Sequence, residues 1–356
     1  MIQIQERSIS KSIDKDAVYP VLYNIWKNKK GFKKVIPESL SKETVFSSID
    51  IIKKEANPVD DFCSPWAIML PHKFKQTSLI RGCSKWVQGR KGVTADLNGI
   101  YMVEVLECNE NKNLVLVRTR PEAGKKDIGP QKKFWIEPDL LFPLVKGASD
   151  FSKCYFKPKN ELYVLVPNQG ITKKFLLAAA DHVENKLPKT YRYFRSYKDL
   201  LADRSTYKAR LKKYDFYMIY NVGDYTFSPY KVIWAEQSGK FAAAVVGQKD
   251  TPLKGEVPFI PDHKIYFVDC SDKAQAHYLC GLLAAPLVCE FIESHTISIQ
   301  VSNIFKHLDL PEFDAENEEH MLLAEKVEEA HKEHDENERS RLLMTIGELA
   351  ETIIGQ

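Results

Sequence analysis

Alternating apolar and polar residues fill the middle of the chain and predict short strands. Residues 100–106 and 114–118 alternate with a period of two, and a turn-forming cluster at 109–113 lies between them. This arrangement predicts a β-hairpin. Further strands are predicted at 134–136, 161–166, 231–234, 241–246 and 264–268.

Helical periodicity appears between and after these strands. Helices are predicted at 172–187, at 197–213, at 274–284 and from Pro286 to about residue 293. Ser196 and Asp199 fit the N-cap and N3 positions of the 197–213 helix, and Ser271 or Asp272 fits the cap of the helix at 274–284. The string IEPDLLFPLVKG at 136–147 is interpreted as a core helix that a proline ends.

Both ends of the chain have helical character. Residues 1–60 predict an amphipathic helix, a basic patch at 27–34 and a second helix or strand at 45–54. Near the C-terminus, apolar stripes recur at helical spacing: Leu322, Leu323, Val327 and Ala330, then Leu342, Ile346, Leu349 and Ile353. These stripes either fold back on their own domain or form a spacer that docks on a partner. Together the elements predict an α/β (α+β) fold with a mixed sheet and a C-terminal helical segment.

Composition is that of a soluble globular protein. The chain has 356 residues, 44% of them hydrophobic and 28% charged, with a net charge of only +3, so a role with nucleic acid depends on local clusters of cations. No secretion signal or membrane-spanning run is predicted, so we expect a cytoplasmic protein. Scattered cysteines without a CxxC pair predict reduced thiols: Cys63, Cys83, Cys108, Cys154, Cys270, Cys280 and Cys289.

Two stretches carry candidate chemistry for nucleic acid. The first is VQGRKGVTADLNGIYMVEV at 87–105, in which Gly89, Gly92 and Gly99 permit backbone conformations that other residues resist. Its donors suited to phosphates or base edges are Arg90, Lys91, Thr94 and Asn98. A plain glycine-rich turn is the alternative interpretation.

The second stretch, 189–234, interleaves aromatic and basic residues. Lysine and arginine at this density neutralise phosphates, and tyrosine rings contact the backbone or stack on an unpaired base. The candidates for backbone or base contact are Arg192, Arg195, Lys208, Arg210 and Lys231. The alternative is that the rings belong to a core and the cations to a solvated helix face.

The string GRKGVTADLNG at 89–99 resembles the G-R-x-G-[IV]-T-x-x-x-N signature of the region downstream of the catalytic domain in N6-adenine DNA methyltransferases, including type IIG restriction enzymes. Similar strings follow in the same order: IEPDLLFPLVKG at 136–147, YRYFRSYKDLLADR at 191–204, FSPYKVIWAE at 227–236 and LPEFDAENEEHMLLAEKVEEAH at 310–331. The resemblance implies a DNA target-recognition domain at 61–310, an N-terminal connector at 1–60 and a helical spacer or docking segment at 311–356.

The catalytic half of that family is missing. Its Asn/Asp-Pro-Pro-aromatic tetrad is absent, since the nearest string, Asn57-Pro58-Val59-Asp60, lacks the second proline and the ring, and no glycine-rich cofactor loop is found. We therefore expect no catalysis by this chain alone and no cofactor in it. The resemblance implies double-stranded DNA as one partner and, as another, a methyltransferase or restriction subunit that binds S-adenosylmethionine and is reached through the C-terminal helices.

The sequence gives only weak support for a nuclease site or a metal site. Asp96 with Glu110 and Lys112, or Asp262-His263-Lys264, matches a Mg²⁺ nuclease pattern poorly, because Glu110 and Lys112 fall in a predicted turn. A metal site at His320, His331 and His334 competes with a solvated helix face. The alternative functions are a nuclease component of a defence system and a methyltransferase remnant that binds proteins.

Overall fold

The computed structural model describes residues 54–61, 63–168, 182–237, 239–295 and 303–356. The chain divides into two compact units, Met1–Ser78 and Leu79–Gln356. In the first unit, β1 (Glu55–Pro58) pairs antiparallel with β2 (Trp66–Met69), and α3 (Pro71–Gln76) follows. This strand pair lies across residue 60, where the sequence placed its first domain boundary. The elements predicted before residue 54 lie outside the described residues.

A six-stranded sheet forms one half of the second unit. Its order is β15-β7-β10-β4-β5-β6, antiparallel except for the parallel pair β15 and β7, so the predicted mixed sheet is confirmed. The bounds are β4 (Met102–Asn109), β5 (Leu114–Thr119), β6 (Lys133–Ile136), β7 (Leu141–Val145), β10 (Tyr163–Leu165) and β15 (Ile260–Pro261). The predicted hairpin is β4 and β5, closed by a short helical turn at Glu110–Lys112.

The string at 136–147 forms a strand, and the prediction of a core helix there is wrong. All five residues of β7 are buried, and the strand pairs with β10 on one side and β15 on the other. A strand covered on both faces has a continuous apolar sequence, and periodicity cannot separate it from a buried helix.

A four-stranded sheet forms the other half of the second unit, in the order β12-β11-β16-β3. Its strands are β3 (Arg90–Lys91), β11 (Tyr230–Ala235), β12 (Ala243–Val246) and β16 (Ile265–Cys270). Helix α8 (Lys273–Ala284) packs on β11 and β12, and the Asp272 carboxylate caps it by accepting from Gln275 N at 2.8 Å, as predicted. Helix α9 (Pro286–His295) follows the break at Pro286.

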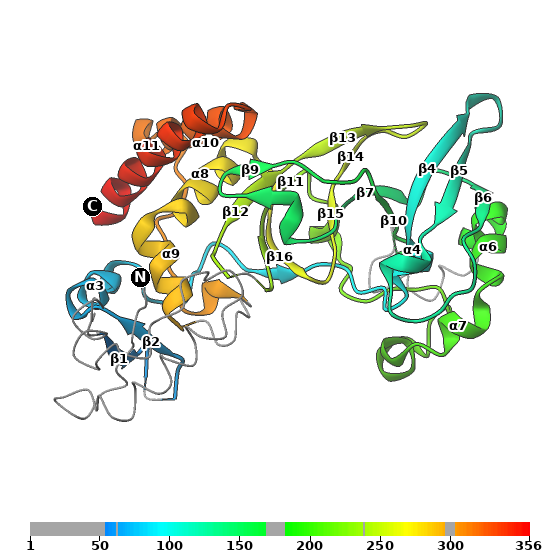
Figure 1. Cartoon of the computed structure of the whole chain (residues 1–356), viewed down its shortest axis with the longest axis horizontal. Helices are drawn as coiled ribbons and strands as arrows, with labels where there is room; N and C mark the ends of the chain where they lie inside the picture. The colour runs from blue at the N-terminus through cyan, green and yellow to red at the C-terminus, as the bar shows by residue number, and fades with distance from the viewer. Residues whose placement is uncertain (1–53, 62, 169–181, 238, 296–302) are drawn as a thin grey trace, which may run out of the picture. The chain divides into compact units, whose positions relative to one another are not determined.

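The C-terminal stripes fold back on the second unit. Helices α10 (Glu318–Lys332) and α11 (Glu336–Gly355) lie along α8, as Figure 1 shows. Leu323 and Val327 of α10 are buried against Gly281 of α8, where an added Cβ would lie only 2.8 Å from the Leu323 side chain. Of the two alternatives for these stripes, the structure therefore has the first, and the α/β fold with a helical C-terminal segment is confirmed.

The predicted helix at 197–213 is interrupted. The chain forms α6 (Pro188–Arg195), α7 (Lys198–Ala202) and a π-helical turn at Tyr207–Leu211. Ser196 ends α6 instead of capping the next helix, since its hydroxyl donates to Tyr193 O at 2.7 Å. Of the helix predicted at 172–187, only a π-helical turn at His182–Lys186 lies within the described residues.

Shorter elements complete the second unit. They are α4 (Asn98–Tyr101), the strand pairs β8 (Phe151–Ser152) with β9 (Tyr155–Phe156) and β13 (Gln248–Thr251) with β14 (Gly255–Pro258), and 3-10 turns at Pro121–Ala123, Ala148–Asp150, Asp224–Phe227 and Ile304–Lys306. A further 3-10 turn, Thr77–Leu79, spans the boundary between the two units. Among the described residues, no single helix is long and apolar enough to cross a membrane; α8 and α9 meet that test only together, and they are bent by 67°.

Candidate nucleic-acid interface

The glycine-rich turn connects the two sheets of the second unit. It begins as β3 on the edge of the four-stranded sheet and continues through α4 into β4 of the six-stranded sheet. None of Gly89, Gly92 and Gly99 has a positive φ, contrary to the reason given from the sequence. They are needed for close packing instead: a Cβ on Gly92 would lie 2.3 Å from Asp262 O, and one on Gly99 would lie 2.7 Å from Arg120 O.

The two cations at the start of the turn are engaged within the sheet. The Arg90 guanidinium lies 4.8 Å from the centroid of the Tyr225 ring. Lys91 forms an ion pair with Glu236 and keeps 33% of its side chain exposed. Either cation has to leave these contacts, at least in part, to reach a phosphate.

Thr94 and Arg210, far apart in the sequence, meet through Tyr220. Thr94 N donates to Tyr220 O at 2.9 Å, and the Asn221 amide donates to the Thr94 hydroxyl at 3.1 Å. Arg210 Nη1 donates to the Tyr220 hydroxyl at 2.7 Å and lies over the ring, with Cζ 4.9 Å from its centroid. Two of the predicted contact residues therefore belong to one polar cluster.

Asn98 lies beside the loop that follows β5. Arg120 N donates to Gly99 O at 3.0 Å, and a Cβ on Gly124 would lie 3.9 Å from Asn98 Cβ. The turn thereby fixes the backbone of Arg120, a residue that the sequence analysis did not select.

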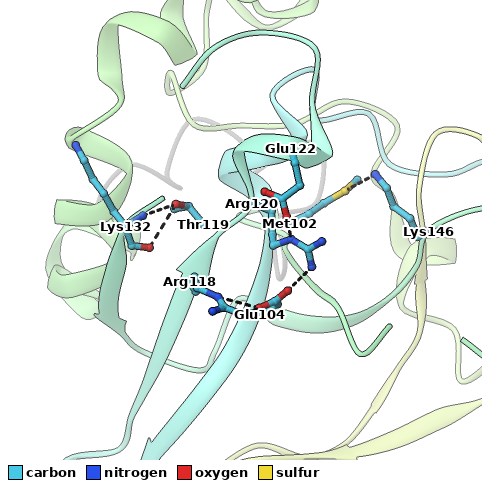
Figure 2. Close-up of polar contacts among 8 residues, drawn as sticks. All are labelled: Met102, Glu104, Arg118, Thr119, Arg120, Glu122, Lys132 and Lys146. Carbon is cyan, nitrogen blue, oxygen red and sulfur yellow. Dashed lines mark hydrogen bonds and ion pairs between the residues drawn. The ribbon is translucent and has the colours of Figure 1, made fainter. Parts of the chain in front are cut away.

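Arg120 belongs to an ion-pair network drawn in Figure 2, which we call the Glu104 cluster: Glu104, Arg118, Arg120 and Glu122. One Glu104 oxygen accepts from Arg118 Nε at 2.9 Å and from Arg118 Nη2, and the other accepts from Arg120 Nη1. Arg120 Nε also donates to Glu122. Both arginines remain partly exposed, Arg118 by 35% and Arg120 by 18%.

Helix α6 presents a basic face. Arg192 and Arg195 are exposed, as is Lys189 one turn earlier, whereas Tyr193 and Phe194 are buried against the sheet. The Phe134 and Tyr193 rings meet edge to face at 4.8 Å, which places α6 on the side of the sheet to which Phe134 points. Arg192 and Arg195, which the sequence predicted as DNA contacts, are therefore accessible from solvent.

The string at 136–147 supplies the carboxylate that fixes α6. Glu137 accepts from Lys189 N at 3.0 Å and from Thr190 N at 2.8 Å, the free donors of the first helical turn. Burial raises the pKa of Glu137, but the hydrogen bonds from Thr190 and Lys189 outweigh it and leave the pKa below the ordinary value. The capping group thus comes from a distant strand connection.

Replacing Glu137 by glutamine is expected to lower the free energy of unfolding by about 1 kcal/mol at pH 7, because an amide accepts these bonds less strongly and offers one oxygen only. An acid whose folded pKa is lowered stabilises above its ordinary pKa and loses that effect as the pH falls. Urea denaturation of the two proteins should therefore converge in acid. Glu312→Gln, at an exposed position, is the control; an equal loss in that variant would contradict the capping role.

Lys208 lies on the surface in a shared ion pair. Its Nζ is 2.6 Å from one oxygen of Asp203, and Lys126 Nζ is 2.7 Å from the other. The two lysines lower the pKa of Asp203 to about 2 through hydrogen bonds and charge. This exposed pair is available to exchange its carboxylate for a phosphate.

The prediction that Lys231 contacts DNA is wrong. Its side chain is fully buried in β11, its Nζ donates to Ser228 O at 2.7 Å, and burial lowers its pKa to about 7. A side chain with no exposed surface cannot bind a phosphate, so we remove it from the candidate interface. Arg204, in the same aromatic and basic stretch, is also buried and contacts backbone carbonyls.

The residues weighed for metal chemistry have structural contacts. Asp262 is fully buried, 3.5 Å from Lys146 Nζ and 2.6 Å from His263 Nδ1, and Glu110 and Lys112 lie in the hairpin turn as predicted. In the described part of the chain, no group of three or more histidine, cysteine or acidic side chains is arranged to hold a metal ion. His320 is buried beside Tyr278, His331 is half-buried and burial lowers its pKa to about 4, and His334 is exposed. All seven cysteines are free thiols.

The chain is similar in sequence to a known methyltransferase and in structure to a known restriction-modification enzyme. No protein-family model matches the chain. The type II methyltransferase M.NspV of Nostoc sp. (strain ATCC 29411 / PCC 7524) is 28% identical over 159 residues, which is 45% of this chain and 30% of that protein. The structure of the type IIL restriction-modification enzyme MmeI in complex with DNA aligns with a TM-score of 0.40 and 12% identity, over 77% of this chain and 33% of that one.

The structural likeness is too low to carry an argument. The sequence match is informative over its own length, although the chain spans less than a third of the methyltransferase. Over these 159 residues, the chain is related to a type II methyltransferase.

Proposed function

We propose that this chain recognises DNA sequence as the specificity component of a restriction-modification system and catalyses no reaction alone. The observation that carries the proposal is the basic face of α6, where Arg192 and Arg195 are exposed on a helix that is capped by Glu137 and anchored by buried rings. A rigid helix with exposed cations is suited to holding phosphates in a fixed register. The partial similarity to a type II methyltransferase supports DNA as the polyanion.

In this proposal the residues divide by role. The arginines of α6 and the exposed Lys208 position the duplex through its phosphates. The cluster of Thr94, Tyr220 and Arg210, with Asn98 beside the Arg120 loop, lies at the junction between the sheets and offers donors to base edges.

Methylation of the N6-adenine type is assigned to a partner subunit that binds S-adenosylmethionine. Apart from Leu322, the apolar stripes of α10 and α11 pack on the second unit, so docking uses the outer side of these helices. Leu322 on α10 and Met344 on α11 are 40% and 64% exposed and supply apolar area for such a contact.

The double variant Arg192→Ala and Arg195→Ala is expected to weaken binding to every duplex by a similar factor. The slope of log affinity against log salt should fall by about two, one for each lost phosphate contact. Fluorescence anisotropy on a random-sequence duplex across a salt series measures both effects.

Arg341→Ala, on the exposed side of α11, is the matched control and should leave the slope unchanged. Equal slopes in the wild type and the α6 double variant would contradict the α6 assignment. Cleavage of DNA by the purified chain with Mg²⁺ would overturn the non-catalytic part of the proposal.

A further inference from the structure

We infer that the Glu104 cluster is a base-reading site, in which Arg118 and Arg120 recognise guanine edges in the major groove and Glu104 positions them. The inference rests on the proposed DNA-binding function and adds a specificity-determining site on the opposite side of the sheet from α6. None of these residues was predicted from the sequence as a DNA contact.

Strand geometry separates this site from the α6 face. Along β5, Val117 and Thr119 are fully buried, whereas Arg118 and Arg120, the residue directly after the strand, are partly exposed and bind the same Glu104 carboxylate. Successive side chains of a strand point to opposite faces, and Val117 pairs with Phe134, whose ring meets Tyr193 of α6. The arginines therefore lie on the sheet face that α6 does not cover.

The hydrogen bonds leave recognition groups free on both arginines. A guanidinium has five N–H donors in a fixed plane. Arg118 uses Nε and Nη2 on Glu104, and Arg120 uses Nη1 on Glu104 and Nε on Glu122. The other N–H groups of these two arginines have no hydrogen-bond partner among the described residues. Two donors in one plane match the O6 and N7 acceptors of guanine.

Charge favours base reading over phosphate binding at this site. Glu104 and Glu122 offset the two guanidinium charges, so the cluster contributes little to long-range attraction of a polyanion. The same carboxylates hold the guanidinium planes in place, and hydrogen bonding to base edges requires such a fixed orientation. Holding the side chains before binding also reduces the conformational entropy that is lost when DNA binds. Figure 2 shows Glu104 between the two arginines.

The glycine-rich turn fixes the cluster from its other side. Gly99 O accepts from Arg120 N, and a side chain at Gly99 would collide with the Arg120 carbonyl. Lys133 pairs with Arg118 across β5 and β6 and is exposed, so it adds a cation at the edge of the same face. Glu104 and Arg118 thus lie on paired strands, whereas Arg120 and Glu122 lie in the loop after β5 that the glycine-rich turn contacts.

Selection from a randomised duplex library with the full chain tests the inference. The wild type is expected to enrich duplexes with guanine at defined positions. Arg118→Lys and Arg120→Lys should each lose a preference of roughly ten-fold at one of those positions, because an ammonium cannot form the two planar bonds. Affinity and salt slope on a random duplex should stay unchanged, because the charge is kept.

The variant Glu104→Gln tests whether Glu104 positions Arg118 and Arg120 for base recognition or only affects binding to phosphates through its charge. Removing a negative charge should raise affinity for a random duplex while the guanine preference broadens, because the arginines are no longer held. The control is Glu107→Gln, at an exposed position on the same strand. Urea denaturation checks that each variant is folded.

Each result decides something different. A lysine variant that keeps the wild-type preference, or a wild type that binds duplex DNA but enriches no sequence, overturns the base-reading site and leaves the DNA-binding proposal intact. Absence of duplex binding at any salt concentration overturns both.

Discussion

Replacing Arg204 by methionine is expected to lower the free energy of unfolding by about 3 kcal/mol or more, the largest loss that we expect from a single substitution. The residue is only 3% exposed, and its guanidinium donates to the carbonyl oxygens of Leu201, Ala95, Phe216 and Met218 at 2.7–3.0 Å. Each buried acceptor left without a donor costs about 1–3 kcal/mol, and the costs are only partly additive.

A lysine at position 204 should give an intermediate loss. An ammonium has three donors and no planar fork, so it cannot satisfy carbonyls on every side that the guanidinium reaches. Because Ala95 belongs to the glycine-rich turn and Met218 to the segment before Tyr220, the loss should also loosen the polar cluster of Thr94, Tyr220 and Arg210.

Urea denaturation of the full chain measures the loss. Arg195→Met, on the exposed face of α6, is the matched control and should change stability by no more than about 0.5 kcal/mol. If Arg204→Met unfolds at the same urea concentration as that control, the carbonyl contacts do not stabilise the fold.

Replacing Lys231 by methionine is expected to stabilise the protein, by about 1–4 kcal/mol at pH 6. The side chain is fully buried with one backbone acceptor, Ser228 O, and with Asp269 opposite it on β16. Removing an ammonium from water costs more free energy than its hydrogen bond and charge interaction here regain. An apolar side chain of similar length fills the same space without that cost. The carbonyl left without its donor reduces the gain.

The pH dependence distinguishes this cause from a packing effect. Burial lowers the pKa of Lys231 to about 7, so the folded state favours the neutral amine. The unfavourable ammonium is present in full below that pH, and the unfolded chain binds more protons from there up to the ordinary lysine pKa near 10.4. Wild-type stability should therefore rise relative to the variant across this range, by at most about 1.4 kcal/mol per pH unit.

Denaturation at a series of pH values between 6 and 9.5 gives the test, with Lys264→Met at an exposed position as the control. A difference between wild type and Lys231→Met that is constant with pH would mean that Lys231 does not change its protonation. The same variant should keep the salt slope of DNA binding, since this side chain reaches no phosphate.

Local patterns in the sequence were sufficient for elements that short-range interactions stabilise. The β4 and β5 hairpin follows from alternation around a turn-forming cluster, and the Asp272 cap follows from the few residues beside it.

Contacts between residues far apart in the sequence decided which secondary structure the apolar runs form and how the helices pack. The apolar run of β7 became a strand because β10 and β15 supply hydrogen bonds on both edges, and the expected helix after Ser196 broke into shorter turns. The stripe of α10 turned inward because Gly281 of α8 lets Leu323 and Val327 pack closely against that helix.

The lysine and arginine side chains show most clearly which properties follow from the sequence and which follow from tertiary contacts. From the sequence, Arg192, Arg204 and Lys231 are equivalent members of one basic and aromatic stretch, yet only the first is exposed. The sequence by itself determined which charges and which hairpins the protein has. Tertiary structure decided which charges remain in water and which arginines share a carboxylate, because burial and ion pairing depend on partners that lie far away along the chain.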